Sequence, residues 1–182
     1  MTTIIFIDRK FRKNTTKYII QCVLATLTIF AALLFLDVLN ETAIITALGA
    51  STFIVFTMPK QYSSDSRRLI GGYLVGLAVG FVFYIISTLF FKTMISINNT
   101  TLLVIFGSLA VGFAIFIMAI TNTEHAPAAG IALGLVINKW DYVTIIFIIV
   151  VVIWMYGIKT ILSKFLMDLI SPHENPPQEH RR

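Results

Sequence analysis

The sequence predicts an all-α, polytopic bundle of transmembrane helices, and three observations lead to this prediction. The chain has 182 residues, 57% of them hydrophobic and only 13% charged, and its mean hydropathy of +0.87 is above the usual range of soluble domains. The apolar residues form long runs with few charges inside them, as expected where lipid is the solvent. The basic residues behind the net charge of +5 flank these runs, so the expected partner is a lipid bilayer and not a nucleic acid.

Six apolar segments follow one another in the order long, short, long, long, short, long. They are residues 18–36, 43–58, 69–91, 101–120, 127–137 and 142–162. At 1.5 Å per residue, the four long segments can cross a hydrocarbon core about 30 Å thick, whereas the short ones reach only about 24 Å and about 16 Å. Each short segment must therefore borrow polar flanks, thin the bilayer, or begin part-way through the membrane inside protein.

The distribution of lysine and arginine predicts the orientation of the bundle. If all six segments cross, twelve of the fourteen basic residues lie on the side of both termini, and only Lys92 and Lys139 lie on the other. Because short cytoplasmic loops are enriched in these residues, we expect both termini in the cytoplasm and the chain in the plasma (inner) membrane. Re-entrant short segments would weaken this bias. The domains are then a basic cytoplasmic segment 1–17, a single transmembrane domain 18–162 and a polar cytoplasmic tail 163–182.

The order of segment lengths divides the transmembrane domain into two similar halves. Three crossings in each half make the second half begin on the opposite side, which predicts a 3+3 inverted repeat. The matching short segments contain small residues, Gly49-Ala50-Ser51-Thr52 in the first half and Ala128-Ala129-Gly130 in the second. Paired short segments point to a transport site, and two ordinary tilted helices in a thin bundle are the alternative.

Small residues recur every four positions on the third and fifth segments. They are Gly72, Gly76 and Gly80 on the third and Ala126, Gly130 and Gly134 on the fifth. Since lipid supplies no hydrophobic drive between helices, such stripes let backbones approach closely and associate. We expect both stripes to contact other helices of the same chain, and an interface in a homo-oligomer is the alternative.

The shortest segment follows the most polar cluster of the domain, in the stretch "TNTEHAPAAG". Pro127 fits the first turn of a helix, where its missing N–H needs no partner. The amides of Ala128, Ala129 and Gly130 would then point back toward His125 with a partial positive charge, and their small side chains leave room for a small anion. Backbone donors hold an anion less tightly than a buried lysine would, as conduction requires.

His125 has three possible roles: donor to an anion, proton carrier, or structural partner of Glu124. An ionisable group near membrane depth is by default a functional hypothesis, and imidazole titrates near physiological pH. Glu124 would orient the ring or keep it protonated, and a loop pair wetted by the cytoplasm is the alternative. One histidine and one carboxylate are not a ligand set, so we expect no metal and no cofactor. No nucleophile, base and oxyanion constellation is evident, so we expect no enzyme.

The loop "PKQYSSDSRR" ends in two arginines, Arg67 and Arg68, at the cytoplasmic start of the third segment. Topology alone explains basic residues at this place. The alternative is that they attract anions to a cytoplasmic mouth.

Three motifs resemble the HPP family of small integral membrane proteins, which is named for a His-Pro-Pro motif followed by small residues. The matching stretch here is His125-Ala126-Pro127-Ala128-Ala129, with Ala126 in place of the first proline. A second match is Gly49-Ala50-Ser51, leading through Phe56 to Pro59, and a third is Arg67 with Gly71, Gly72 and Gly80 downstream. The family's Pro-Arg-Asn is replaced by Ser66-Arg67-Arg68. The family is often described with four membrane helices, which agrees with six segments only if the short ones are not counted.

The resemblance implies a transmembrane bundle and, for members in chloroplasts and cyanobacteria, nitrite transport. We therefore expect a transporter or channel for a small monovalent anion, most of all nitrite, bound near mid-membrane by residues of the two short segments. These residues are Gly49, Ala50, Ser51, Thr52, His125, Ala126, Pro127, Ala128, Ala129 and Gly130. Ser51, Thr52 and His125 would be side-chain donors, and Glu124 and His125 are candidates for proton coupling. The alternative is a non-transporting sensor or assembly subunit.

Overall fold

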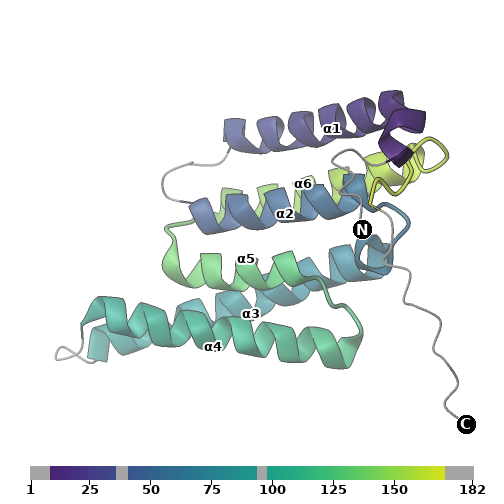
Figure 1. Ribbon diagram of the computed structural model, residues 1–182. Helices are drawn as coiled ribbons and strands as arrows, with labels where there is room; N and C mark the ends of the chain where they lie inside the picture. Colours follow the sequence, from purple (N-terminus) through teal and green to yellow (C-terminus); the bar gives the residue numbers. More distant parts are fainter. Residues whose placement is uncertain (1–8, 36–40, 94–97, 171–182) are drawn as a thin grey trace, which may run out of the picture.

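Six α-helices form a bundle in the computed structural model, which describes residues 9–35, 41–93 and 98–170 (Figure 1). The long helices are α1 (Arg9–Phe35), α3 (Ser66–Thr93), α4 (Asn99–Thr121) and α6 (Tyr142–Ile161). The short ones are α2 (Thr42–Thr57) and α5 (Ala126–Ile137), and a single 3₁₀ turn, η1 (Tyr62–Ser64), lies between α2 and α3. The prediction of an all-helical bundle whose second and fifth helices are short is confirmed, since four helices are long and apolar enough to cross a membrane.

The first helix begins earlier than the sequence predicts. It starts at Arg9, inside the basic segment assigned to the cytoplasm, and only Arg12–Leu34 is apolar enough for a membrane span. Asn14 leaves the helical conformation, with φ −134° and ψ 30°. This break separates a short basic turn from the apolar part of α1. Residues 1–8 of the predicted N-terminal segment and residues 171–182 of the predicted tail lie outside the described residues.

The chain reverses at alternate ends of the bundle, so α1 begins at the same end at which α2 and α6 finish (Figure 1). Gln21 ties these parts together, because its Nε2 donates to the carbonyl oxygens of Phe56 at 2.5 Å and Met167 at 2.9 Å. Residues that follow α6 also pack here: Leu169 is buried, and its amide donates to the carbonyl oxygen of Thr57 at 2.8 Å. The beginning of the predicted tail is therefore part of the packed bundle.

The short helix α2 extends from one end of the bundle to the other. Just before its start, Glu41 accepts a hydrogen bond of 2.5 Å from Thr144 in the first turn of α6. At its end, Thr57 meets Leu169 beyond α6. Since α2 passes alongside the whole of α6, it does not turn back within the bundle as a re-entrant segment would.

The short helix α5 lies at the centre, between α2 on one side and α3 and α4 on the other (Figure 1). Gly72, Gly76 and Gly80 of α3 lie directly against it. A Cβ atom at Gly72 would stand 2.7 Å from the Cβ of His125, and one at Gly76 would overlap the carbonyl oxygen of Ala128. The glycine stripe of α3 thus brings two helix backbones into contact.

The opposite side of α5 uses its own glycines against α2. A Cβ at Gly134 would stand 2.8 Å from Ile44 Cγ1, and one at Gly130 would stand 3.4 Å from the Cβ of Ala47. Ala126, the first member of this predicted stripe, is exposed. Both stripes therefore serve packing within the chain, apart from Ala126.

Large apolar side chains cover much of the outer surface of the bundle. Examples are Leu34 on α1, Phe116 on α4 and Trp154 on α6, all more than half exposed. Soluble proteins rarely expose so much continuous apolar surface. The surface is that of an integral membrane protein, with lipid as the solvent of its outer faces.

Candidate functional site

Three polar side chains meet in the apolar core, where α2 and α3 converge on the start of α5. Ser51, Tyr73 and His125 are 0%, 2% and 1% exposed. Ser51 Oγ lies 2.7 Å from the hydroxyl oxygen of Tyr73 and 2.8 Å from Nε2 of His125. The fold thus brings Ser51 and His125, from the two short segments of the sequence, into direct contact. We call these three residues the polar chain.

The hydrogen bonds of the polar chain run in one direction. His125 Nδ1 donates to the carbonyl oxygen of Ser63 at 3.2 Å, because a carbonyl oxygen only accepts. In a neutral imidazole Nε2 is then the acceptor, so the Ser51 hydroxyl donates to it. The Tyr73 hydroxyl donates to Ser51 Oγ, which is closer than the Ala47 carbonyl oxygen at 3.3 Å. Each side chain therefore uses its one polar hydrogen within the protein.

The charge of His125 is controlled by burial. The residue lies in the connection between α4 and α5, outside the four long helices, and loss of solvation lowers the pKa of its imidazole to about 4 despite the hydrogen bond to Ser63. The ring is therefore neutral at physiological pH in this conformation. An anion beside it would favour the imidazolium and raise the pKa again, so protonation and anion binding would strengthen each other.

The polar chain also explains why α5 is short. Tyr73 comes seven residues after Ser66, the first residue of α3, which places it about 10 Å inward along that helix. The ring of His125 lies beside that of Tyr73, with their centroids 5.7 Å apart. Because His125 is the N-cap of α5, this helix begins at the same depth, inside the bundle.

The first turn of α5 differs from the predicted arrangement of open amides. Pro127 occupies its second position, as the helix-start prediction requires, and Pro127, Ala128 and Ala129 are buried. The amide of Ala128 donates to the carbonyl oxygen of His125 at 2.9 Å. The Ala128 amide therefore already has a partner in this structure, and the donors that meet at the start of α5 are the side chains of the polar chain.

Only one residue of the run from Gly49 to Thr52 reaches the polar chain. Ser51 does so, while Gly49 lies nearest a side chain of α1 and Ala50 is exposed. Thr52 faces α6, where its Oγ1 lies 3.3 Å from Met155 Sδ. The candidate site is therefore narrower than the predicted set of residues.

Glu124 lies away from the imidazole that it is predicted to orient. Both ring nitrogens of His125 have other partners. The Glu124 carboxylate oxygen Oε2 lies 3.7 Å from Arg68 Nε and 3.5 Å from the hydroxyl oxygen of Tyr62, and its side chain is half-exposed. Glu124 therefore belongs to a separate polar group at the end of the bundle.

Sequence reasoning missed Tyr73 and Ser63. A signal existed for Tyr73, since it is a hydroxyl-bearing residue next to Gly72 in an otherwise apolar stretch. Ser63 contributes a backbone carbonyl, which no side-chain pattern announces. The loop that carries it is also held by Lys159 of α6, whose Nζ donates to the carbonyl oxygen of Ser64. The loop is thus fixed over His125 from two sides.

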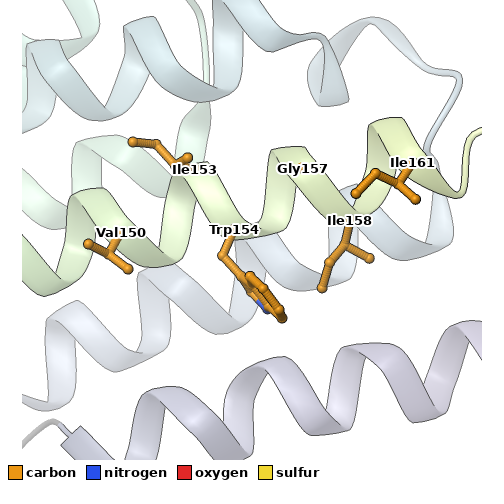
Figure 2. Close-up of a pocket in the computed structure, with 6 residues that line it drawn as sticks. All are labelled: Val150, Ile153, Trp154, Gly157, Ile158 and Ile161. Carbon is orange, nitrogen blue, oxygen red and sulfur yellow. The ribbon is translucent and has the colours of Figure 1, made fainter.

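Two surface grooves lie away from the polar chain. One of about 420 Å³ runs along α6 and is lined by Val150, Ile153, Trp154, Gly157, Ile158 and Ile161 (Figure 2). The other, of about 490 Å³, lies between α3 and α4 and is likewise apolar. Such grooves suit lipid chains and not a small anion. Within residues 9–35, 41–93 and 98–170, no three His, Cys, Asp or Glu side chains come together as a metal site.

Comparison with known proteins gives one match. The family model described as "HPP, transmembrane region" matches residues 10–172, a range that contains the whole polar chain. No curated protein and no solved structure matches the chain.

Proposed function

We infer that this protein, which belongs to the HPP family of transmembrane proteins, carries a small monovalent anion across the membrane. Nitrite is the first substrate to test, because it is the anion that the resemblance to chloroplast and cyanobacterial members implies. A membrane-embedded helical bundle with a polar centre is the architecture that such transport requires.

One observation carries this proposal: the 2.8 Å contact between Ser51 Oγ and His125 Nε2. Polar groups inside a membrane protein are costly and are by default functional. Here a titratable ring and two hydroxyls come from three different segments and meet at the start of a helix. Packing alone would be served by apolar residues of the same size.

Protonation of His125 would turn the polar chain from a closed network into an anion site. In the neutral state its hydrogens are all used internally. An imidazolium carries a hydrogen on Nε2 as well, so the Ser51 hydroxyl no longer finds an acceptor there and is free to donate to an anion. The positive ring and the anion would then compensate each other's charge in the apolar core. A proton would therefore move together with the anion, and half-exposed Glu124 is the candidate for passing it to solvent.

Nitrite uptake into proteoliposomes tests the proposal. We expect uptake above that of empty liposomes, faster when the outside is more acidic than the inside. Ser51→Ala and His125→Gln should each lower the initial rate by about tenfold or more, the equivalent of one lost buried hydrogen bond. Ser108→Ala is the matched control, since Ser108 is an exposed serine of α4 whose hydroxyl bonds only within its own helix.

The non-transporting alternative makes the opposite prediction. A sensor or assembly subunit would show no nitrite uptake under any pH gradient, and the close α3–α5 seam at Gly76 would then be the feature that matters. Absence of uptake by folded wild-type protein would sink the transport proposal.

A further inference from the structure

Arg68 is a nearly buried arginine with one donor left without a hydrogen bond. The residue is 6% exposed, at the start of α3. Its Nη2 donates to Asn122 Oδ1 at 2.9 Å, and its Nη1 lies 3.7 Å from a carboxylate oxygen of Asp65. Its Nε is buried and has no hydrogen-bond partner. A buried guanidinium N–H without an acceptor is destabilising, so its place calls for an explanation.

The nearest anionic group to this Nε is the carboxylate of Glu124. Its Oε2 lies 3.7 Å from Arg68 Nε, an ion pair beyond hydrogen-bonding range. The Tyr62 hydroxyl lies 3.5 Å from the same oxygen, while it donates to Asn122 Oδ1 at 2.7 Å. The side chain of Glu124 is 51% exposed. Glu124 is thus held loosely by charge, and it can move into solvent without breaking a short hydrogen bond.

The aromatic ring of Tyr62 covers the guanidinium of Arg68. This cation–π contact restrains the guanidinium, and Nε is the guanidinium nitrogen that lies 3.7 Å from the Glu124 carboxylate. A fixed guanidinium edge is suited to bind a planar group with two oxygens on one atom.

We propose that Arg68 and Tyr62 form an anion-binding site that the Glu124 carboxylate occupies in this structure, and that a small planar oxyanion displaces it. The inference rests on the proposed function, because the site would receive the transported anion. A carboxylate, nitrite and formate each place two oxygens and one negative charge on a trigonal atom, so the Glu124 carboxylate has the shape of the ligand that would replace it. Chloride lacks this shape.

The position of this site links it to the polar chain. Glu124 is the residue directly before His125, and Asn122, which binds both Arg68 and Tyr62, begins the same connection. Displacement of Glu124 by an anion would therefore act on the segment that carries the imidazole. The site is the first of two positions for the anion, and the polar chain is the second.

Anion binding to the purified full-length protein in detergent tests the proposal, measured by calorimetry with sodium nitrite, formate or chloride at constant ionic strength. Glu124→Gln removes the internal carboxylate and should tighten nitrite and formate binding about tenfold, with chloride affected far less. Arg68→Gln removes the guanidinium and should weaken nitrite and formate binding by about tenfold or more. Arg67→Gln removes the same charge at the exposed neighbour, whose Nη2 donates to the Thr121 carbonyl oxygen, and should leave the affinity unchanged.

Equal affinities of wild type and Glu124→Gln would overturn the proposal, and so would undiminished binding by folded Arg68→Gln. If Arg68→Gln does not fold, the Glu124→Gln comparison decides alone. Failure of this proposal can be distinguished from failure of the transport proposal. A gain in affinity without any nitrite uptake would argue against transport and keep the binding site, whereas uptake without the gain in affinity would argue against the binding site and keep transport.

Discussion

The two short helices match in the sequence but differ in the structure. α2 begins at an end of the bundle beside Glu41 and passes along the whole of α6. α5 begins about 10 Å inside the bundle, at His125. Shortness therefore has two causes: α2 takes a short path from end to end, whereas the first turns of α5 are replaced by a polar connection. Only the second cause creates a buried polar site.

The two short helices also differ in how closely they are packed, and α5 is again the more enclosed of the two. α5 is clamped by the glycines of α3, where a Cβ at Gly76 would overlap backbone. On α2, by contrast, a Cβ at Gly49 would stand 3.9 Å from Cδ1 of Ile29, the flexible end of that side chain. In an inverted repeat α2 and α6 would correspond to α5 and α3, yet α2 packs less extensively against α6 than α5 does against α3. Similar lengths thus do not require similar surroundings, and the inverted repeat stays a prediction.

The largest expected effect is at the α3–α5 seam. Gly76→Ala places a Cβ against the Ala128 carbonyl oxygen, which cannot move without displacing α5, and overpacking of this kind costs about 1–3 kcal/mol or more. Gly130→Ala, on the face toward α2, meets only the Cβ of Ala47 at 3.4 Å and should be nearly neutral, since alanine favours a helix by about 0.5–1 kcal/mol over glycine. Thermal unfolding in detergent measures both. Equal melting temperatures would show that the two faces of α5 are packed alike.

A second effect comes from pH and concerns the start of α5 alone. Burial lowers the pKa of His125 from 6.5 to about 4. Between these two pH values the imidazole is protonated in the unfolded chain but not in the folded chain. Stability should therefore fall as pH decreases below about 6.5, by about 2 kcal/mol at pH 5. Unfolding of wild type and His125→Gln between pH 7 and pH 5 measures this, and the variant should lose less. Nitrite should offset the loss in wild type, because an anion favours the imidazolium.

The acidic residues that precede the two short helices give a third, smaller contrast. Glu41 is 4% exposed and accepts from Thr144, so Glu41→Ala removes a buried, charge-assisted hydrogen bond and should cost about 1–2 kcal/mol. Glu124 is half-exposed and makes only long contacts, so Glu124→Ala should change stability by less than about 0.5 kcal/mol. Chemical unfolding of the two variants provides the comparison. A larger loss of stability in Glu124→Ala than in Glu41→Ala would mean that the Glu124 carboxylate stabilises the connection that precedes α5.

The fold was predictable where it depends on the length of apolar runs. The lipid environment requires such runs, and all six helices lie where the runs lie. Two features were not predictable in this way. The charged residues from Arg9 onward are helical because of local helix propensity and not because of hydropathy. Leu169 is buried because it packs against the ends of α1 and α2, which are distant from it in the sequence.

For the candidate site, the sequence predicted that Ser51 and His125 lie close together but not which other residues they contact. The pairing of Ser51 with His125 followed from their places in the two short segments. Tyr73 was missed because α3 carries two tyrosines, Tyr73 and Tyr84, in an apolar sequence that does not indicate which of their hydroxyls points into the core. The partner of Glu124 was predicted wrongly, since sequence neighbours on an extended N-cap point in different directions, and Arg68 comes from another helix. Contacts across helices are decided by packing, which length and composition do not specify.

The smallest expected effect concerns Tyr73, at the end of the polar chain farthest from His125. It shows whether the Tyr73 hydroxyl only positions Ser51 or itself binds the anion. Tyr73→Phe removes one hydrogen bond to Ser51 but leaves the Ser51–His125 contact in place, so stability should fall by about 1 kcal/mol and nitrite uptake by no more than about fivefold. Tyr84→Phe is the control on the same helix, because Tyr84 lies at the outer surface against Trp140. Loss of uptake in Tyr73→Phe as severe as in Ser51→Ala would instead make the tyrosine hydroxyl a direct ligand of the anion. The start of α5 would then be only one wall of the site, with α3 as the other.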